Sequence, residues 1–302
     1  MNANAITLLD GGMGQELIRR MDGPAPALWS AMVLEERPDL VEAVHGEFIE
    51  AGAEVLTLSN YSVTPPKLAR HGLEDRFEPL HRRAVAVAEA ARDKSGRAVQ
   101  LAGCLPPLVA SYRPDLNLPE RAMAEDYARL VAVQAAHVDL FLCETMTAIS
   151  EALTATEAAL ASGKPVWTAL SVDDANGARL RSGEDLAEAA TAVRAAGAAA
   201  VLVNCSTPEA TTQAMGVLSG LDLPFGAYAN GFVSVAALAP GVTVDVLQAR
   251  TDLGPQAYAD AAMAWAEAGA TIVGGCCEVG PAHIAELAHR LGRTVRPMAI
   301  AV

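Results

Sequence analysis

Three cysteines stand where short apolar segments of the sequence end. Cys276 and Cys277 follow two glycines in "ATIVGGCC", and Cys205 closes "AAVLVNC". Three thiolates that converge on one ion would leave a fourth coordination position open, which is typical of catalytic rather than structural zinc. Thiolates are soft ligands and select zinc over magnesium or calcium. By spacing alone, a metal site and inert packed thiols both remain open, because a Cys-Cys dipeptide is a weaker signal than repeated CxxC motifs.

The two adjacent cysteines constrain the backbone that carries them. Consecutive residues of a strand point to opposite faces, so Cys276 and Cys277 reach one ion only where the strand ends and the backbone bends. The glycines before them permit such a bend. Five cysteines is an odd number, and a chain of 302 residues does not need disulfide staples, so we expect free thiols, metal ligands or catalytic groups. Cys104 and Cys143 lie in apolar runs, and we expect them to pack as small hydrophobic residues.

Composition and charge exclude several classes of partner. The chain is 52% hydrophobic, and 22 basic against 36 acidic residues give a net charge of −14. An acidic surface repels nucleic-acid phosphates and anionic lipid headgroups, so no nucleic-acid or membrane partner is expected. The start, "MNANAITLLDGGMG", has neither the basic segment nor the long apolar core of a secretion signal, and no apolar run reaches the roughly 20 residues that span a membrane. We therefore expect a cytoplasmic protein that acts on small molecules.

Eight short apolar runs alternate with longer, alanine-rich amphipathic stretches. The predicted strands are residues 5–12, 54–60, 99–104, 139–145, 166–172, 199–205, 224–230 and 271–277. Helical periodicity is clearest over 37–53 and 254–270, while 231–254 is irregular and indicates a long loop between a strand and a helix. This alternation predicts an α/β fold, a single-domain (β/α)8 TIM barrel over residues 1–302. A doubly wound sheet remains the alternative, because periodicity alone does not exclude it.

Polar residues concentrate at the carboxyl ends of the predicted strands, where barrel active sites lie. Besides the three cysteines, these ends carry Asp10, Asn60, Glu144 and Asn230. Two of these positions have an ordinary structural alternative. The "DGGMG" loop could be only a tight turn, and Glu144 could lie near a helix N-terminus and stabilise the helix dipole. All six histidines fall elsewhere in the predicted elements, which disfavours a Cys-His or Ser-His nucleophile.

Several motifs together resemble those of the homocysteine S-methyltransferases. They are "DGGMGQEL", "CET", "VNC" and "VGGCC", with "PALWSA", "AGAEVLTLSNYS" and "YANG" in the order in which that family has them. The family is zinc-dependent and includes enzymes that use betaine, S-methylmethionine or S-adenosylmethionine as methyl donor. The resemblance runs through nearly the whole chain. It implies a (β/α)8 barrel in which Cys205, Cys276 and Cys277 bind Zn²⁺.

The resemblance also implies where the substrates bind. The residues concerned are Asp10, Gly11, Gly12, Met13, Trp29, Asn60, Tyr61, Glu144 and Asn230. Asp10 and Glu144 match acidic residues near the homocysteine amino group, and the backbone of the glycine loop could receive its carboxylate. Where many relatives have "GSIGP" and "YPNSG", this chain has "AGCLPP" and "YANGF", so the donor side departs from the family pattern.

We therefore expect zinc-dependent transfer of a methyl group from a sulfonium or quaternary ammonium donor to the thiol of L-homocysteine, as a step of methionine biosynthesis. Zinc would deprotonate that thiol, whose pKa of ~8.5 otherwise keeps it mostly protonated at neutral pH. We expect S-methylmethionine or S-adenosylmethionine ahead of betaine, because a sulfonium methyl is more easily transferred. A homo-oligomer is possible. The alternatives are a methyltransferase or demethylase acting on another thiol, and a non-catalytic barrel that binds zinc or an amino acid.

Overall fold

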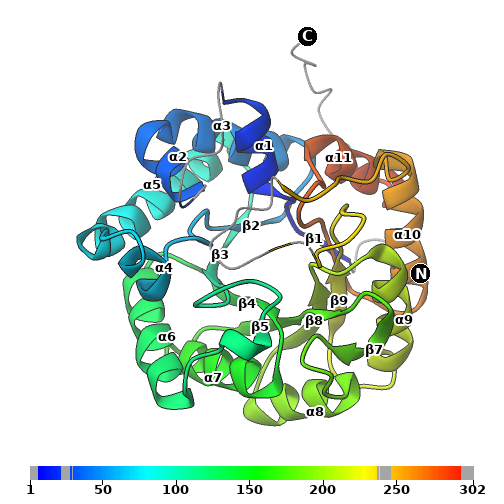
Figure 1. Cartoon of the computed structure of the whole chain (residues 1–302). Coiled ribbons are helices and arrows are strands. Elements are labelled where there is room, and N and C mark those ends of the chain that lie inside the picture. The colour runs from blue at the N-terminus through cyan, green and yellow to red at the C-terminus, as the bar shows by residue number, and fades with distance from the viewer. Residues whose placement is uncertain (1–5, 22–27, 29, 237, 239–245, 294–302) are drawn as a thin grey trace.

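Eight parallel strands surround a central axis in the computed structural model, which describes residues 6–21, 28, 30–236, 238 and 246–293. The strands are β1 (Thr7–Leu8), β2 (Val55–Thr57), β3 (Gln100–Leu105), β4 (Leu140–Met146), β5 (Val166–Leu170), β8 (Ala200–Asn204), β9 (Phe225–Tyr228) and β10 (Ile272–Val273). Their order in the sheet is β1-β10-β9-β8-β5-β4-β3-β2. A parallel bridge between Leu9 and Val55 joins the two ends of this order. The sheet is therefore closed into a barrel (Figure 1).

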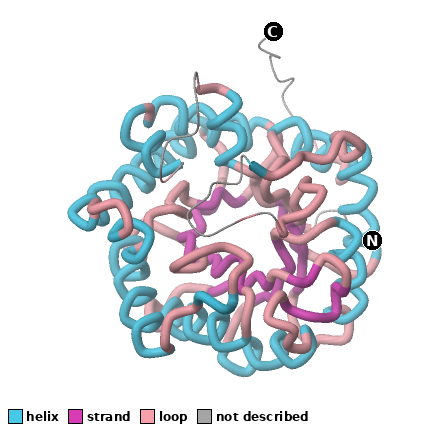
Figure 2. The backbone as a smooth tube through the Cα atoms, viewed as in Figure 1, coloured by secondary structure: helices cyan, strands magenta, loops and turns pink. Residues whose placement is uncertain are grey.

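Helices form a ring around the strands (Figure 2). They are α1 (Met13–Arg19), α2 (Ser30–Glu36), α3 (Pro38–Glu50), α4 (Pro65–Ala69), α5 (Phe77–Ser95), α6 (Glu120–Gln134), α7 (Ile149–Leu160), α8 (Leu186–Ala196), α9 (Pro208–Leu218), α10 (Pro255–Glu267) and α11 (Pro281–Arg290). Several begin with proline, which is preorganised for a first turn and lacks the N–H that would go unbonded there. Short 3₁₀ helices span Glu74–Arg76 and Pro114–Leu116.

Two apolar layers hold the barrel together. The inner layer fills the barrel interior with strand side chains that include Leu9, Val55, Leu142 and Ile272. The outer layer lies between strands and helices and contains most of the buried apolar residues of the described chain. Because alternate strand residues face alternate layers, the strands have apolar residues on both faces and their sequences read as continuous apolar runs. Polar residues of the strands are thereby confined largely to the strand ends.

The structure confirms the barrel, and each of the eight predicted strands overlaps one strand of the barrel. The doubly wound alternative is wrong, because the sheet closes between its first and last strands. Sequence periodicity missed an antiparallel hairpin, β6 (Val172–Asp173) and β7 (Asn176–Leu180), which lies between β5 and α8. The hairpin is short and partly exposed, so it carries little apolar pattern.

The long loop expected at 231–254 connects β9 to α10, and in its described part Phe232 pairs with Ala249. Within the described residues, no helix is both long and apolar enough to cross a membrane.

Candidate active site

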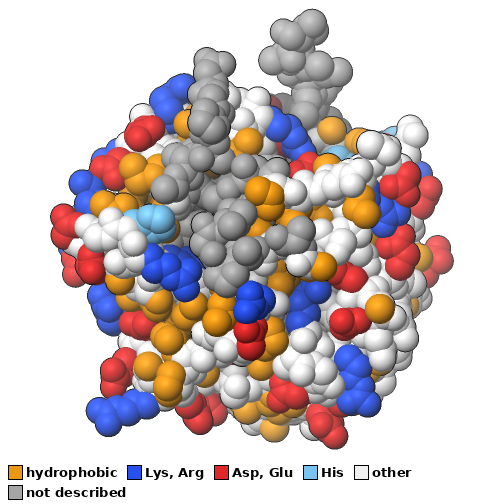
Figure 3. Space-filling view, in the orientation of Figure 1, with side chains coloured by type: hydrophobic (Ala, Val, Ile, Leu, Met, Phe, Trp, Pro, Cys, Tyr) orange, Lys and Arg blue, Asp and Glu red, His pale blue; other side chains and the backbone are white. Residues whose placement is uncertain are grey.

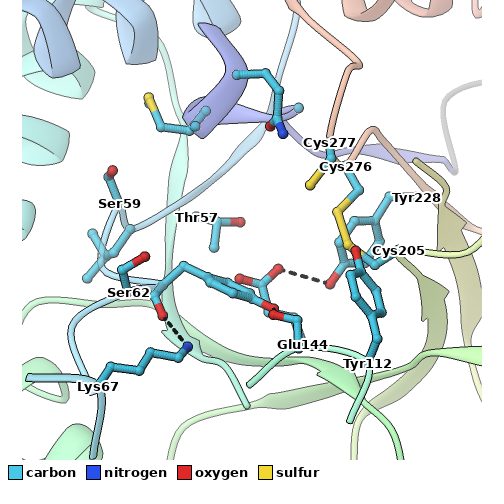
Figure 4. Close-up of a pocket in the computed structure, with 18 of the residues that line it drawn as sticks. Thr57, Ser59, Ser62, Lys67, Tyr112, Glu144, Cys205, Tyr228, Cys276 and Cys277 are labelled. Carbon is cyan, nitrogen blue, oxygen red and sulfur yellow. Dashed lines mark hydrogen bonds between the residues drawn. A yellow bond between two sulfur atoms is a disulfide. The ribbon is translucent and has the colours of Figure 1, made fainter. Parts of the chain in front are cut away.

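A pocket of about 240 Å³ opens at the carboxyl ends of the barrel strands. Its walls come from the segments after β1, β2, β3, β8 and β10, and from the ends of β4 and β9 (Figure 4). The lining residues include Asp10, Gly11, Gly12, Met13, Thr57, Tyr61, Lys67, Tyr112, Glu144, Cys205, Tyr228, Cys276 and Cys277. The predicted concentration of polar groups at the strand ends therefore corresponds to one cavity.

Three sulfur atoms gather on one side of this pocket. The Sγ atoms of Cys205, Cys276 and Cys277 all lie within 4.8 Å of one another. In the structure Cys205 and Cys276 form a disulfide, with Cα atoms 5.8 Å apart, and Cys277 is a free thiol. We expected no disulfide. The barrel brings the ends of β8 and β10 close enough for one, and a disulfide sulfur carries no negative charge. The disulfide and a three-thiolate metal site are therefore alternative states of the same sulfurs.

The glycines around the sulfurs allow close packing rather than an unusual bend. We expected the strand to end before Cys276 and the glycines to permit a bend there; β10 does end at Val273, and neither Gly274 nor Gly275 has a positive φ. A Cβ on Gly275 would overlap the side chain of Val279, and a Cβ on Gly12 would lie 2.5 Å from the carbonyl oxygen of Cys276. The glycine loop after β1 is thus pressed against the segment that carries two of the three sulfurs, which accounts for the glycines in both motifs.

An arginine that sequence reasoning missed holds the third sulfur in place. Cys205 has a left-handed backbone, with φ of 49°, and its carbonyl oxygen accepts a hydrogen bond of 3.1 Å from Nη2 of Arg181. Arg181 also donates to Ser171 Oγ at 2.8 Å, and its guanidinium lies 4.8 Å from the centroid of the Tyr112 ring. Arg181 directly follows β7, the strand that periodicity did not reveal, so no local signal connected it with the cysteines.

Two buried carboxyl groups line the same pocket. Asp10 accepts hydrogen bonds from the backbone N–H of Thr57 at 2.8 Å and from its hydroxyl at 3.3 Å. Burial raises the pKa of Asp10 to about 8, and the nearby charge of Glu144 adds to the shift. Burial likewise raises the pKa of Glu144. A cationic ligand would relieve both shifts, because it favours the charged form of each carboxyl group.

Glu144 is oriented by two side chains. The Cys104 thiol donates to Oε1 at 2.9 Å. The Tyr228 hydroxyl donates to Oε2 at 3.4 Å, and Figure 4 marks this bond by a dashed line. We expected Cys104 only to pack. It is fully buried, as expected, but its thiol also binds a pocket carboxylate. Cys143 is buried in the outer apolar layer.

The other residues implied by the resemblance divide into three groups. Gly11, Gly12, Met13 and Tyr61 line the pocket. Asn60 and Asn230 are fully buried but do not line it: Asn60 donates to the Cys104 carbonyl oxygen at 3.2 Å, and Asn230 accepts from the Phe232 N–H at 3.1 Å. These two asparagines therefore brace the loops around the pocket. Trp29 lies outside the described residues.

A (β/α)8 barrel with a sulfur cluster and buried carboxyl groups at the carboxyl ends of its strands has the architecture of a barrel enzyme. Residues 7–291 match the family model described as homocysteine S-methyltransferase. The chain belongs to that family, as its motifs predicted, and is an enzyme of it.

The sequence similarity to known proteins extends over most of the chain. The homocysteine S-methyltransferase of Escherichia coli is 32% identical, with 94% of this chain and 95% of that protein covered. Homocysteine S-methyltransferase 4 of Zea mays is 29% identical, with 95% and 89% covered. Among solved structures, the metallated form of the homocysteine methyltransferase MmuM from Escherichia coli matches with a TM-score of 0.80 and 29% identity, covering 95% of this chain and 96% of that one. An oxidized form of the same protein matches with the same TM-score and 30% identity, over the same shares of the two chains.

Proposed function

We propose that this chain transfers a methyl group from a sulfonium donor to the thiol of L-homocysteine, and that Cys205, Cys276 and Cys277 hold a zinc ion for this reaction when reduced. The observation that carries the proposal is the position of three sulfurs, within 4.8 Å of one another, in a pocket that also contains two buried carboxyl groups. The metallated form of the Escherichia coli relative supports a metal at this place.

The donor set fits zinc. Three cysteine thiolates are a soft ligand set, and a fourth position left for the substrate is the pattern of catalytic zinc. Zinc at this position would deprotonate the homocysteine thiol and so make its sulfur nucleophilic at neutral pH. The Cys205–Cys276 disulfide must be reduced for these ligands to act. This requirement accords with a role in methionine biosynthesis in the cytoplasm, where thiols are kept reduced.

The chain's own residues would bind and orient the two substrates. Asp10 and Glu144 would hold the ammonium group of homocysteine, since both are buried carboxyl groups that a cation stabilises. Cys104 and Tyr228 fix the direction of the Glu144 carboxylate through their hydrogen bonds. The aromatic faces of Tyr61 and Tyr228 line the pocket and would attract the donor cation. Holding the donor methyl in line with the acceptor sulfur would supply the remaining acceleration.

Zinc content and methionine formation test the proposal together. The reduced protein should bind about one zinc per chain, and Cys205→Ser, Cys276→Ser and Cys277→Ser should each lose most of it. The control Cys143→Ala should keep both zinc and activity, because Cys143 packs in the outer apolar layer. Methionine formation from homocysteine is then measured with S-methylmethionine, S-adenosylmethionine and betaine. Full activity of chelator-treated, metal-free protein would refute the zinc assignment, and a clear preference for betaine would refute the donor assignment.

A further inference from the structure

A lysine extends into the pocket from the wall opposite the sulfurs (Figure 4). Lys67 lies on α4, whose first turn is fixed by Thr64: the Thr64 hydroxyl accepts from the Lys67 backbone N–H at 3.4 Å and donates to the Leu108 carbonyl oxygen at 2.7 Å. The Lys67 Nζ donates to the Tyr61 carbonyl oxygen at 3.0 Å and lies 4.7 Å from the centroid of the Tyr61 ring. The ammonium is thus held at a defined place beside a pocket aromatic.

The Lys67 ammonium has unused hydrogen-bonding capacity. It carries three N–H groups, and the Tyr61 carbonyl takes one of them. Among the described residues, no carboxylate lies within the 4.0 Å of its Nζ that an ion pair requires. The side chain is partly buried, and burial lowers its pKa to about 8, although Glu144 and Glu151 act in the opposite direction. A partly desolvated ammonium without an ion-pair partner is stabilised by an incoming anion.

Charged side chains of both signs line the pocket. Arg70 and His71 follow α4 and line the same wall as Lys67, and Figure 3 shows basic and histidine side chains over α4 on this face. The buried carboxyl groups of Asp10 and Glu144 line the same pocket. A basic wall is notable in a chain with a net charge of −14. Such a pocket is complementary to ligands that carry both charges, and it opposes a donor that is only a cation.

We propose that Lys67 binds the carboxylate of the methyl donor, so that the pocket selects donors that carry a carboxylate and a cationic methyl group in one molecule. This inference rests on the proposed function. The donor is assigned here rather than the acceptor, because other groups of the pocket account for homocysteine: the sulfurs for its thiol, Asp10 and Glu144 for its ammonium, and the backbone of the glycine loop for its carboxylate. Lys67 adds a contact for the donor carboxylate to the aromatic faces of Tyr61 and Tyr228, which would attract the donor cation. A purely cationic donor would be repelled by Lys67, whereas a zwitterionic donor neutralises it.

Equilibrium binding tests the inference independently of turnover. Calorimetry is performed on the reduced, zinc-loaded protein with S-methyl-L-methionine and with betaine, both of which carry a carboxylate, and with the trimethylsulfonium ion, which does not. Lys67→Met should weaken binding of the carboxylate donor about tenfold to a hundredfold, the value of one charged hydrogen bond. Lys67→Arg should retain most of the affinity. Lys67→Met should not weaken binding of trimethylsulfonium, because the variant removes a repulsion.

A matched control makes the same substitution elsewhere. Lys164 precedes β5, at the opposite end of the barrel, so Lys164→Met should bind all three compounds as the wild type does. In steady-state assays Lys67→Met should raise KM for the donor and leave KM for homocysteine unchanged. A rise in KM for homocysteine alone would assign Lys67 to the acceptor and overturn the inference. The inference would also be overturned if Lys67→Met bound the carboxylate donors as tightly as the wild type does, or if the wild type bound neither of them. Wild-type protein that binds a donor but forms no methionine would instead contradict the proposed function.

Discussion

A buried histidine on α3 should make the protein sensitive to acid, and its replacement by leucine should remove that sensitivity. His45 is fully buried, and neither ring nitrogen has a hydrogen-bond partner among the described residues. Burial without a partner disfavours the charged imidazolium and lowers the pKa of His45 to about 4, from an ordinary value of 6.5. Leucine is similar in volume and has no polar atom, so His45→Leu should be tolerated in this apolar environment.

The magnitude follows from the two pKa values. As pH falls below 6.5, His45 binds a proton in the unfolded chain, whereas in the folded chain it binds one only near pH 4. The free energy of unfolding therefore falls through this interval. At about 1.4 kcal/mol per pKa unit, the full loss below pH 4 is about 3 kcal/mol, and the loss between pH 7.5 and pH 5 is about 2 kcal/mol. Asp10 and Glu144 act in the opposite direction, because their raised pKa values make the folded state bind the extra proton.

The difference between variants isolates the contribution of His45, because the carboxyl groups are common to both proteins. Urea unfolding of the reduced protein, followed by circular dichroism, is measured between pH 7.5 and pH 5. The free energy of unfolding of His45→Leu relative to wild type should increase by about 2 kcal/mol over this range. The control His137→Leu removes an imidazole that is 48% exposed and should show no such increase. If the free energies of unfolding of His45→Leu and wild type changed with pH in parallel, burial would not oppose the protonation of His45. That result would refute the reasoning.

Two further predictions concern side chains that act through the site residues. Arg181→Met removes the hydrogen bond to the Cys205 carbonyl and the contact with the Tyr112 ring, so the zinc dissociation constant, measured by competition with a chelator, should rise about tenfold to a hundredfold; an unchanged constant would show that Arg181 does not position Cys205. Cys104→Ser keeps a donor for Glu144 and should keep kcat/KM for homocysteine, whereas Cys104→Val should lower it about tenfold through the lost hydrogen bond. Equal activity of the two Cys104 variants would restore the view that Cys104 only packs.

The sequence by itself determined the architecture and the places where chemistry could occur. Each strand is an apolar run with polar residues at its end, because strands buried on both faces tolerate polar side chains only where they leave the barrel. Asp10, Glu144 and the three cysteines could therefore be assigned to strand ends, and so to the mouth of one barrel, before their distances were known. The motifs around them were specific enough in combination to predict the family, which the comparisons confirm.

Only the tertiary structure decided which of these groups contact one another and which further residues support them. The close approach of Cys205 and Cys276, the bond from Cys104 to Glu144 and the contact of Arg181 with Cys205 join residues that are between 24 and 71 positions apart. Periodicity reports which face of an element is buried, but not which distant side chain it meets there. Lys67 was missed for the same reason. Its sequence neighbours indicate only an ordinary short helix, and its proposed role depends on the pocket that its side chain lines in the folded barrel.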